Sequence, residues 1–312
     1  VIPLGAFPTY DATGKVDITN EPMVENPFFP TGKDKLTVVP EGGKLEMPNV
    51  QTITMKPASA EEKAHITAQV GSVSTERRVL SPGSELVYKF DTAGAAGAGF
   101  DVLIKGRGYR IDASPDGKRW YQRLLTWSDK PVMQSIDLSA FTGSHDELLQ
   151  LVRIVPGSDQ DYLQAGGAPA LQRDNCRYAS STAGFVYRIA LPDVSECHLE
   201  MILGNAYKVQ CSSDGKSWQD AISYKDITAK PEPDAGWMRI LDVTKYLGAD
   251  KVLYIRIADS GASADFDNRM AFLRRLTVYG TFDSDNVFVR LANTSISGDA
   301  TVIESAAFRS WK

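Results

Sequence analysis

A fifteen-residue segment occurs twice in this chain, and this repeat limits what the chain can fold into. Residues 106–120 read Gly-Arg-Gly-Tyr-Arg-Ile-Asp-Ala-Ser-Pro-Asp-Gly-Lys-Arg-Trp, and residues 204–218 read Gly-Asn-Ala-Tyr-Lys-Val-Gln-Cys-Ser-Ser-Asp-Gly-Lys-Ser-Trp. The copies lie 98 positions apart and agree at seven of fifteen positions, with Gly, Tyr and Trp among the matches. An internal repeat of this kind indicates one structural unit used more than once.

Shorter matches extend the repeat in both directions. Residues 87–90 match 186–189, residues 136–138 match 241–243, and residues 151–154 match 254–257. The offset drifts between matches, which indicates that only the loops differ in length. We therefore expect a first β-sandwich over 41–172 and a second over 173–282. Residues 1–40, rich in turn formers, are interpreted as a linker or wrapping arm, and 283–312 as a C-terminal extension with at least one strand.

Both copies show the side-chain alternation of half-buried strands. Tyr109, Ile111 and Ala113 alternate with polar residues, as do Tyr207, Val209 and Cys211 in the second copy. The Asp-Gly pairs at 116–117 and 214–215 are hairpin-turn signals, because glycine accepts a positive φ. We expect Tyr109 and Tyr207 to be buried at equivalent places, and Trp120 and Trp218 to fill the core. The fold class is all-β, with one short helix within 58–68.

The composition excludes several classes of protein. A net charge of −5 and no basic stripe argue against nucleic acid as a partner, and no apolar run is long enough to insert into a membrane. Three cysteines, Cys176, Cys197 and Cys211, are too few for a disulfide scaffold. A Cys197–Cys211 bridge stays open, but the inward position of Cys211 in the repeat favours buried free thiols.

The string Tyr-x-(Ile/Val)-x-x-Ser-x-Asp-Gly-Lys-x-Trp resembles the hallmark of galactose-binding-like jelly rolls. These include discoidin-type domains and carbohydrate-binding modules of secreted glycosidases. The resemblance covers residues 80–155 and 180–280, and residues 271–278 resemble the closing strand of that family. It implies tandem sandwiches of antiparallel sheets, a secreted or cell-surface setting, glycan ligands held by loops at one end, an adjoining catalytic domain in a longer enzyme, and a structural calcium ion. No ligand set for calcium is apparent.

The sequence shows no catalytic motif. Its three histidines lack metal spacing, and neither a Gly-x-Ser-x-Gly elbow nor a phosphate-binding loop occurs. We therefore name no catalytic residue, although the abundance of carboxylates leaves a glycosidase-like pair open.

Sugar sites combine an aromatic ring, which packs on the C–H face, with Asp, Asn and Arg, which bond to hydroxyls. Loops in the second copy hold these ingredients in Trp237, Asp259, Asp265, Asp267, Asn268 and Arg269. In the first copy the candidates are Trp127, Asp161 and Tyr162. The alternative without a binding site is that the tryptophans pack on the ends of the sandwiches and the polar cluster is solvated.

Three functions follow as hypotheses. The leading one is a non-catalytic carbohydrate-binding protein, or the binding part of a secreted glycan-active enzyme. The second is a structural or adhesion spacer that binds protein. The third is a polysaccharide-acting enzyme whose catalytic carboxylates lie in irregular loops.

Overall fold

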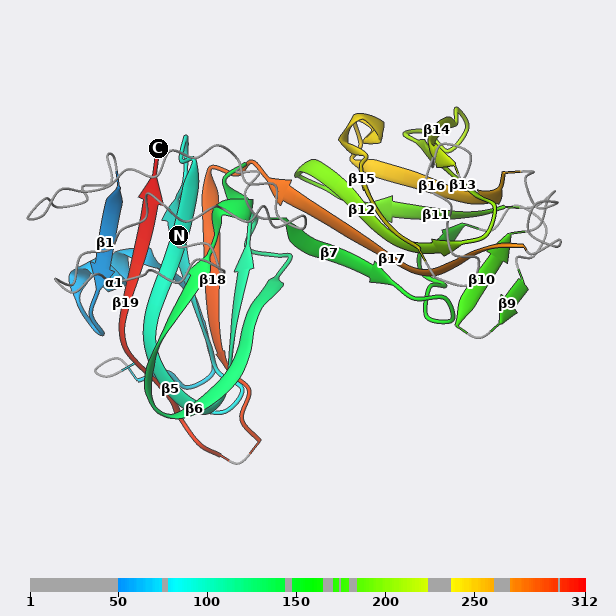
Figure 1. Ribbon diagram of the computed structural model, residues 1–312. Helices are drawn as coiled ribbons and strands as arrows, with labels where there is room; N and C mark the ends of the chain where they lie inside the picture. Colours follow the sequence, from blue (N-terminus) through cyan, green and yellow to red (C-terminus); the bar gives the residue numbers. More distant parts are fainter. Residues whose placement is uncertain are drawn as a thin grey trace, which may run out of the picture. The chain divides into compact units, whose positions relative to one another are not determined.

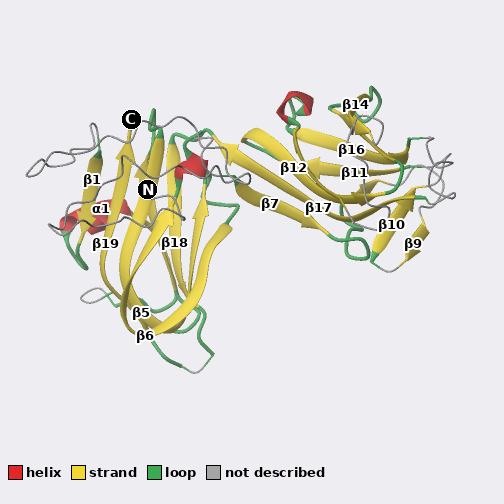
Figure 2. Cartoon of the chain, in the orientation of Figure 1, coloured by secondary structure: helices red, strands yellow, loops and turns green. Residues whose placement is uncertain are grey.

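The computed structural model describes residues 50–74, 78–143, 148–164, 171–173, 175–179, 184–223, 237–260, 270–296 and 298–312. These residues form antiparallel sheets with one short α-helix, so the predicted all-β class is confirmed (Figure 2). The helix α1 (Ala60–His65) lies within the predicted 58–68, and Ser59 caps it by accepting the Glu62 amide. No described helix has the length and apolar character needed to cross a membrane.

An eight-stranded sheet forms what we call the outer module. Its order is β1-β19-β5-β18-β4-β2, while β3 pairs with β19 and β6 pairs with β5. Its strands are β1 (Gln51–Met55), β2 (Ile66–Val70), β3 (Val79–Leu80), β4 (Glu85–Asp91), β5 (Gly97–Ser114), β6 (Tyr121–Asp137), β18 (Asn286–Asn293) and β19 (Thr301–Trp311).

Strand β5 belongs to both layers of the outer module. Its first part, up to Lys105, pairs with β19, and its last part, from Tyr109, pairs with β18 (Figure 1). The pairing with β6 shifts register around Gly106, and such irregularities bend a strand. The bend brings Phe90 of β4 and Phe308 of β19 into a parallel stack with ring centroids 4.2 Å apart. The core therefore lies between two layers of one folded sheet.

A six-stranded and a five-stranded sheet form what we call the inserted module. The first has the order β15-β12-β17-β10-β9 with β7 on β17, and the second the order β14-β13-β16-β11-β8. Their strands are β7 (Leu149–Ile154), β8 (Leu163–Gln164), β9 (Leu171–Arg173), β10 (Cys176–Ala179), β11 (Phe185–Ala190), β12 (Val194–Gly204), β13 (Tyr207–Ser212), β14 (Gln219–Ser223), β15 (Trp237–Asp242), β16 (Val252–Asp259) and β17 (Ala271–Phe282).

The strand pairing divides the chain differently from the predicted ranges 41–172, 173–282 and 283–312. Strand β7 lies in the first range but pairs with β17 of the second, from Leu149–Gly280 to Ile154–Leu276. Strands β18 and β19, expected as an extension, complete the outer module beside β5 (Figure 1, orange and red). The copies are thus nested rather than tandem. The sequence match of residues 151–154 with residues 254–257 does not mark equivalent strands. Short runs of apolar residues occur in many strands, so this match is not specific.

Strand β18 occupies in the outer module the place that β16 occupies in the inserted one. In the outer module Phe288 pairs with Lys89, whose amino group lies 5.6 Å from the ring centroid. In the inserted module Tyr254 pairs with Arg188, whose guanidinium lies 5.9 Å from the ring centroid. Residues 287–291, Val-Phe-Val-Arg-Leu, also resemble residues 253–257, Leu-Tyr-Ile-Arg-Ile. This match, and not that of 151–154, is therefore the third match of the repeat.

The repeated motif builds the same turn twice. The Asp116 carboxylate accepts the amides of Lys118 and Arg119, each at 2.8 Å, and Asp214 does the same one repeat later. Gly117 and Gly215 have φ values of 70° and 71°, as the sequence predicts. Tyr109 and Tyr207 are buried at equivalent positions, which confirms their predicted role in the core.

The prediction that Trp120 and Trp218 fill the core is wrong, because both are half-buried. Each ring lies under an arginine from the neighbouring strand: Arg290 is 4.4 Å from the centroid of Trp120, and Arg256 is 6.0 Å from that of Trp218. Arg256 lies between the buried Ile255 and Ile257, so its side chain is on the face of the sheet opposite the core. The Trp218 ring, which it contacts, lies on that same outer face.

Each module also buries one carboxylate bound to an arginine and a tyrosine. Glu62 accepts Arg78 Nε at 2.7 Å and the Tyr88 hydroxyl at 2.9 Å. In the inserted module, Asp159 accepts Arg177 Nη2 at 2.6 Å and the Tyr187 hydroxyl at 2.6 Å. The two triads satisfy charges that would otherwise be costly to bury.

All three cysteines are buried free thiols, as the repeat favoured. Burial raises the pKa of both Cys197 and Cys211 to about 12, so neither is a thiolate near neutral pH.

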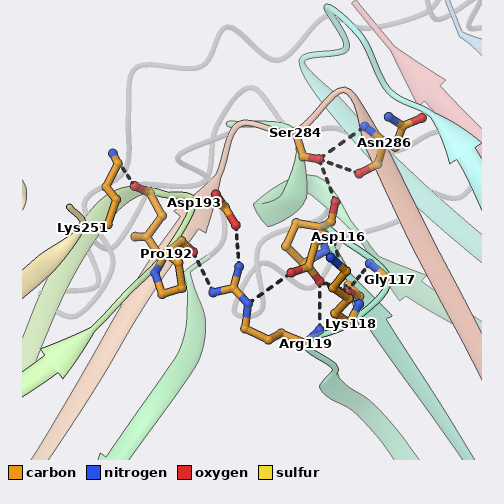
Figure 3. A network of polar contacts seen from close by, with 12 residues as sticks. Asp116, Gly117, Lys118, Arg119, Pro192, Asp193, Lys251, Ser284 and Asn286 are labelled. Atoms are coloured by element: carbon orange, nitrogen blue, oxygen red, sulfur yellow. Dashed lines mark hydrogen bonds and ion pairs between the residues drawn. The ribbon is translucent and has the colours of Figure 1, made fainter. Parts of the chain in front are cut away.

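The repeated turn of the outer module also contacts the inserted module. Arg119 donates to the carbonyl of Pro192 at 2.8 Å and to the carboxylate of Asp193 (Figure 3). Ser284, between β17 and β18, donates its hydroxyl to the carbonyl of Pro115, so the return of the chain from the inserted module to the outer module lies beside this turn.

Candidate functional site

Two of the predicted site residues lie at one end of the inserted module. Trp237 begins β15 opposite Leu203, and Asp259 ends β16 opposite Tyr207. The backbone of the turn at 204–207 lies between them, and Ser260 donates its amide to Ala206 at 2.6 Å. Asp265, Asp267, Asn268, Arg269 and the side chain of Trp237 lie outside the described residues. The loop site at this end therefore stays a prediction.

The first-copy candidates lie elsewhere. Trp127 is on β6 of the outer module and is 66% exposed, as a binding platform would be. Asp161 and Tyr162 lie in the turn between β7 and β8, where Tyr162 packs against the core. The carbonyl of Tyr162 accepts the amide of Arg188 at 2.8 Å, which gives this residue a structural role. The structure does not bring Trp127 together with the other two.

A pair of arginines that the sequence analysis did not single out lies on the outer face of the six-stranded sheet. Between the buried Leu273 and Leu276, strand β17 holds Arg274 and Arg275. The partner strand β12 pairs Ile202 with Arg275 and Leu203 with Leu273, so Arg274 is the extra residue of a β-bulge. A bulge re-aims side chains, and here it presents two consecutive arginines on one face.

Arg275 is held in place by its neighbours. Its Nη2 donates to Glu200 Oε1 at 2.5 Å, and the Tyr279 hydroxyl donates to Glu200 Oε2 at 3.1 Å. Burial raises the pKa of Tyr279, and the nearby Glu200 carboxylate raises it further, so the phenol remains a donor. Arg275 Nε is buried and has no hydrogen-bond partner among the described residues. The Glu200 contact therefore fixes the guanidinium without using all its donors.

The two arginines line an open basin of about 450 Å³. Its other lining residues are Arg153, Val155, Asn175 and Ile202. Every charged residue in this lining is an arginine, although the whole chain carries a net charge of −5. The basin is thus a local cationic surface on an acidic protein.

An aromatic pair on β17 and its neighbour β10 lies next to Arg274 and Arg275. Tyr178 of β10 pairs with Phe272 of β17, and their ring centroids are 5.8 Å apart. A Cβ placed on Gly204 would lie 2.2 Å from the Phe272 ring, so only glycine lets this ring lie across β12. The half-buried aromatic surface lies between the arginine bulge and the turn at 204–207.

The outer module has the same bulge with different chemistry. Strand β19 shifts register against β5 between Ile303 and Ser305, which makes Glu304 the extra residue. The pair Glu304-Ser305 thus occupies the place of Arg274-Arg275. The duplication kept the bulge, but only the inserted module carries the arginines.

The described residues contain no group of three or more His, Cys, Asp or Glu side chains arranged to hold a metal ion. The calcium ion implied by the resemblance remains an expectation without a site among these residues.

Comparison with known proteins reveals no family. No protein-family model matches the chain, and no curated protein matches it. Among solved structures, the chain is similar to a crystal structure of the plant peptide RALF23 in complex with FER and LLG2. The identity is 8%, the match covers 77% of this chain and 97% of that chain, and the TM-score is 0.31.

Two further solved structures are similar to the chain. The tandem CBM51 modules of a family 98 glycoside hydrolase from Streptococcus pneumoniae share 9% identity over 73% and 99% of the two chains, with a TM-score of 0.23. An exo-β-1,3-galactanase from Phanerochaete chrysosporium shares 15% identity over 51% of this chain and 36% of that one, with a TM-score of 0.29. At these TM-scores the likenesses carry no argument about function.

Proposed function

We propose that this chain is a non-catalytic carbohydrate-binding protein with galactose-binding-like jelly-roll modules, or the binding part of a longer glycan-active enzyme. The observation that carries the proposal is the basin beside Arg274 and Arg275, with Tyr178 and Phe272 next to it. A sugar ring packs its C–H face on an aromatic surface, and guanidinium groups donate to its oxygens. Both ingredients lie side by side on this sheet.

The expected affinity is weak, with Kd around 10⁻³–10⁻⁵ M. A shallow open basin buries little of a sugar, and each hydrogen bond to a hydroxyl replaces one to water. Binding of this strength suits a module that keeps an attached or neighbouring enzyme on a polymer. We propose a glycan as the partner of the protein, and a secreted or cell-surface setting, as the family resemblance implies.

The carboxyl groups of Asp116, Asp159 and Asp242 hold structural positions. Burial alone would raise the pKa of Asp116 and Asp159, but hydrogen-bond donors around each anion lower it, and hydrogen bonds from Thr244 lower the pKa of Asp242. These groups build turns and buried ion pairs.

The test is a glycan array on the whole chain, followed by calorimetric titration of the strongest hit. We expect Tyr178→Ala to weaken binding at least tenfold, because the aromatic surface loses half its area, with an unchanged circular dichroism spectrum. Trp127→Ala, which removes an exposed ring from the outer module, is the matched control and should bind normally. An array without hits would refute glycan binding. Lost binding in Trp127→Ala alone would move the site to β6.

A second function, protein binding by a spacer, is favoured by one feature of β6. Leu125, Trp127 and Met133 are 57%, 66% and 55% exposed and lie on β6, which among the described strands pairs with β5 alone. A group of exposed apolar side chains on an edge strand is typical of a contact surface. A blank array, together with sedimentation that shows self-association lost in Trp127→Ser, would support this alternative.

A further inference from the structure

The charge of the basin limits which glycan it accepts. Arg153, Arg274 and Arg275 line it, and Arg153 and Arg274 form no ion pair with any described residue. Glu200 neutralises only Arg275, and its carboxylate is already engaged by that arginine and by Tyr279. Two of the three guanidinium groups are thus left without a counter-charge among the described side chains.

Arginine, rather than lysine, at all three positions suits a planar or multi-oxygen anion. A guanidinium presents parallel N–H donors that match two oxygens of a carboxylate or sulfate group. The bulge places Arg274 directly beside the tethered Arg275, and Arg153 approaches from β7, which pairs with β17 on the side opposite β12. An anion in the basin therefore has donors from two strands.

We propose that the basin binds an anionic sugar residue, with its carboxylate or sulfate ester among Arg153, Arg274 and Arg275. This inference rests on the proposed glycan binding and names its ligand class. The neighbouring Tyr178–Phe272 pair provides the apolar surface for the ring of that sugar or of the next one in the chain.

The outer module supplies an internal comparison. Its equivalent bulge carries Glu304 and Ser305, and an acidic side chain there repels an anion. We therefore assign the anionic-sugar site to the bulge of the inserted module and not to the equivalent bulge of the outer module.

The experiment uses the whole chain and an array of neutral, carboxylated and sulfated glycans. Carboxylated or sulfated glycans should be the strongest hits, and each should bind at least tenfold more weakly after methyl esterification or desulfation. The two kinds of hit distinguish a carboxylate from a sulfate ligand. Binding should also weaken steeply between 50 and 500 mM NaCl, because salt screens the attraction. Strongest hits that are neutral and insensitive to salt would overturn the inference while leaving glycan binding in place.

Variants then locate the site by calorimetry. Arg274→Gln changes an exposed residue, so the fold is retained, and it should weaken the anionic hit at least tenfold while sparing its neutral derivative. Arg153→Gln should have a similar effect. Glu304→Gln, the same bulge position in the outer module, is the matched control and should leave the Kd and a stoichiometry of one unchanged. Normal binding by Arg274→Gln and Arg153→Gln would refute the basin, and an array without any hits would refute the proposed function itself.

Discussion

The guanidinium of Arg290 lies 4.4 Å from the ring centroid of Trp120, although the whole inserted module separates the two residues in the chain. Arg290 also donates to the buried Asp112 carboxylate at 2.8 Å. The corresponding pair, Arg256 and Trp218, lies within one uninterrupted copy of the repeat. The shared contact shows that β18 completes the first copy of the repeat, although the second copy lies between them in the sequence.

Removal of either tryptophan should cost less than the loss of a core ring. A fully buried ring loses about 3–5 kcal/mol when replaced by alanine. Because Trp120 and Trp218 are half-buried under arginines, we expect Trp218→Ala to cost about 1–2 kcal/mol, from lost apolar burial and the cation–π contact. Trp120→Ala should cost more, since its arginine is closer. Urea unfolding of both variants measures this order, and equal or reversed losses would contradict it.

The buried triads should be far more sensitive than the tryptophans. Arg177→Leu leaves the Asp159 carboxylate, which is fully buried, without its counter-charge, and we expect a loss of about 3–5 kcal/mol. Tyr187→Phe removes only one hydrogen bond to the same carboxylate and should cost about 1–2 kcal/mol. Thermal unfolding of the two variants and of Arg177→Leu combined with Asp159→Leu provides the comparison. The double variant should recover part of the loss, and a double variant less stable than Arg177→Leu would show that unpaired charge is not the cause.

The repeated turn predicts how stability changes in acid. Partial burial alone would raise the pKa of Asp116, but the amides of Arg119 and Lys118 and the Ser114 hydroxyl donate to it and lower its pKa to about 2. An unfolded aspartate has a pKa of about 3.9. The turn's contribution is therefore fully present above pH 4 and is lost as the pH falls towards 2. Urea midpoints measured across this window should decline less steeply in Asp116→Asn than in the wild type, and parallel curves would exclude the turn as a source of the acid response.

The sequence predicted the repeated strands and turns because their signals are local. Alternation around Tyr109 and Tyr207, the Asp-Gly pairs and the inward place of Cys211 depend on neighbouring residues only. The nested order was not predicted because it depends on pairing between β5 and β18, which lie far apart in the sequence. The weak resemblance of residues 287–291 to residues 253–257 is the one local signal of it.

The basin was missed for a related reason. Residues 271–278 were interpreted as a closing strand, but the three-residue step from Leu273 to Leu276 breaks the two-residue period of a regular strand. The same step occurs from Ile303 to Ala306 in the outer module. A bulge, and with it a pair of arginines on one face, was therefore readable from that spacing. The loops at 224–236 and 261–269 lie outside the described residues, so the site predicted around Trp237 stays a prediction.

The nested order makes the last thirty residues indispensable to the outer module. Strand β18 lies between β4 and β5, and its Val287, Val289 and Leu291 are buried. A chain that ends at Phe282 keeps the ranges 41–172 and 173–282, which the sequence predicted to be two tandem sandwiches. It loses β18 and β19. We expect its outer module to unfold, because two strands of its core are missing.

The inserted module should survive the same truncation. Its first and last strands pair with each other, at Leu149 and Gly280, so its two ends meet, as is typical of inserted domains. The complementary variant joins Gly143 to Asp283 by a short glycine linker, which is sterically feasible because Gly143 donates its amide to Phe282 at 2.7 Å. This chain should keep a folded outer module. Proteolysis and amide exchange of the truncated chain and of the linked chain test these two expectations. If β4 and β5 were protected from exchange in the truncated chain, the copies would fold in tandem.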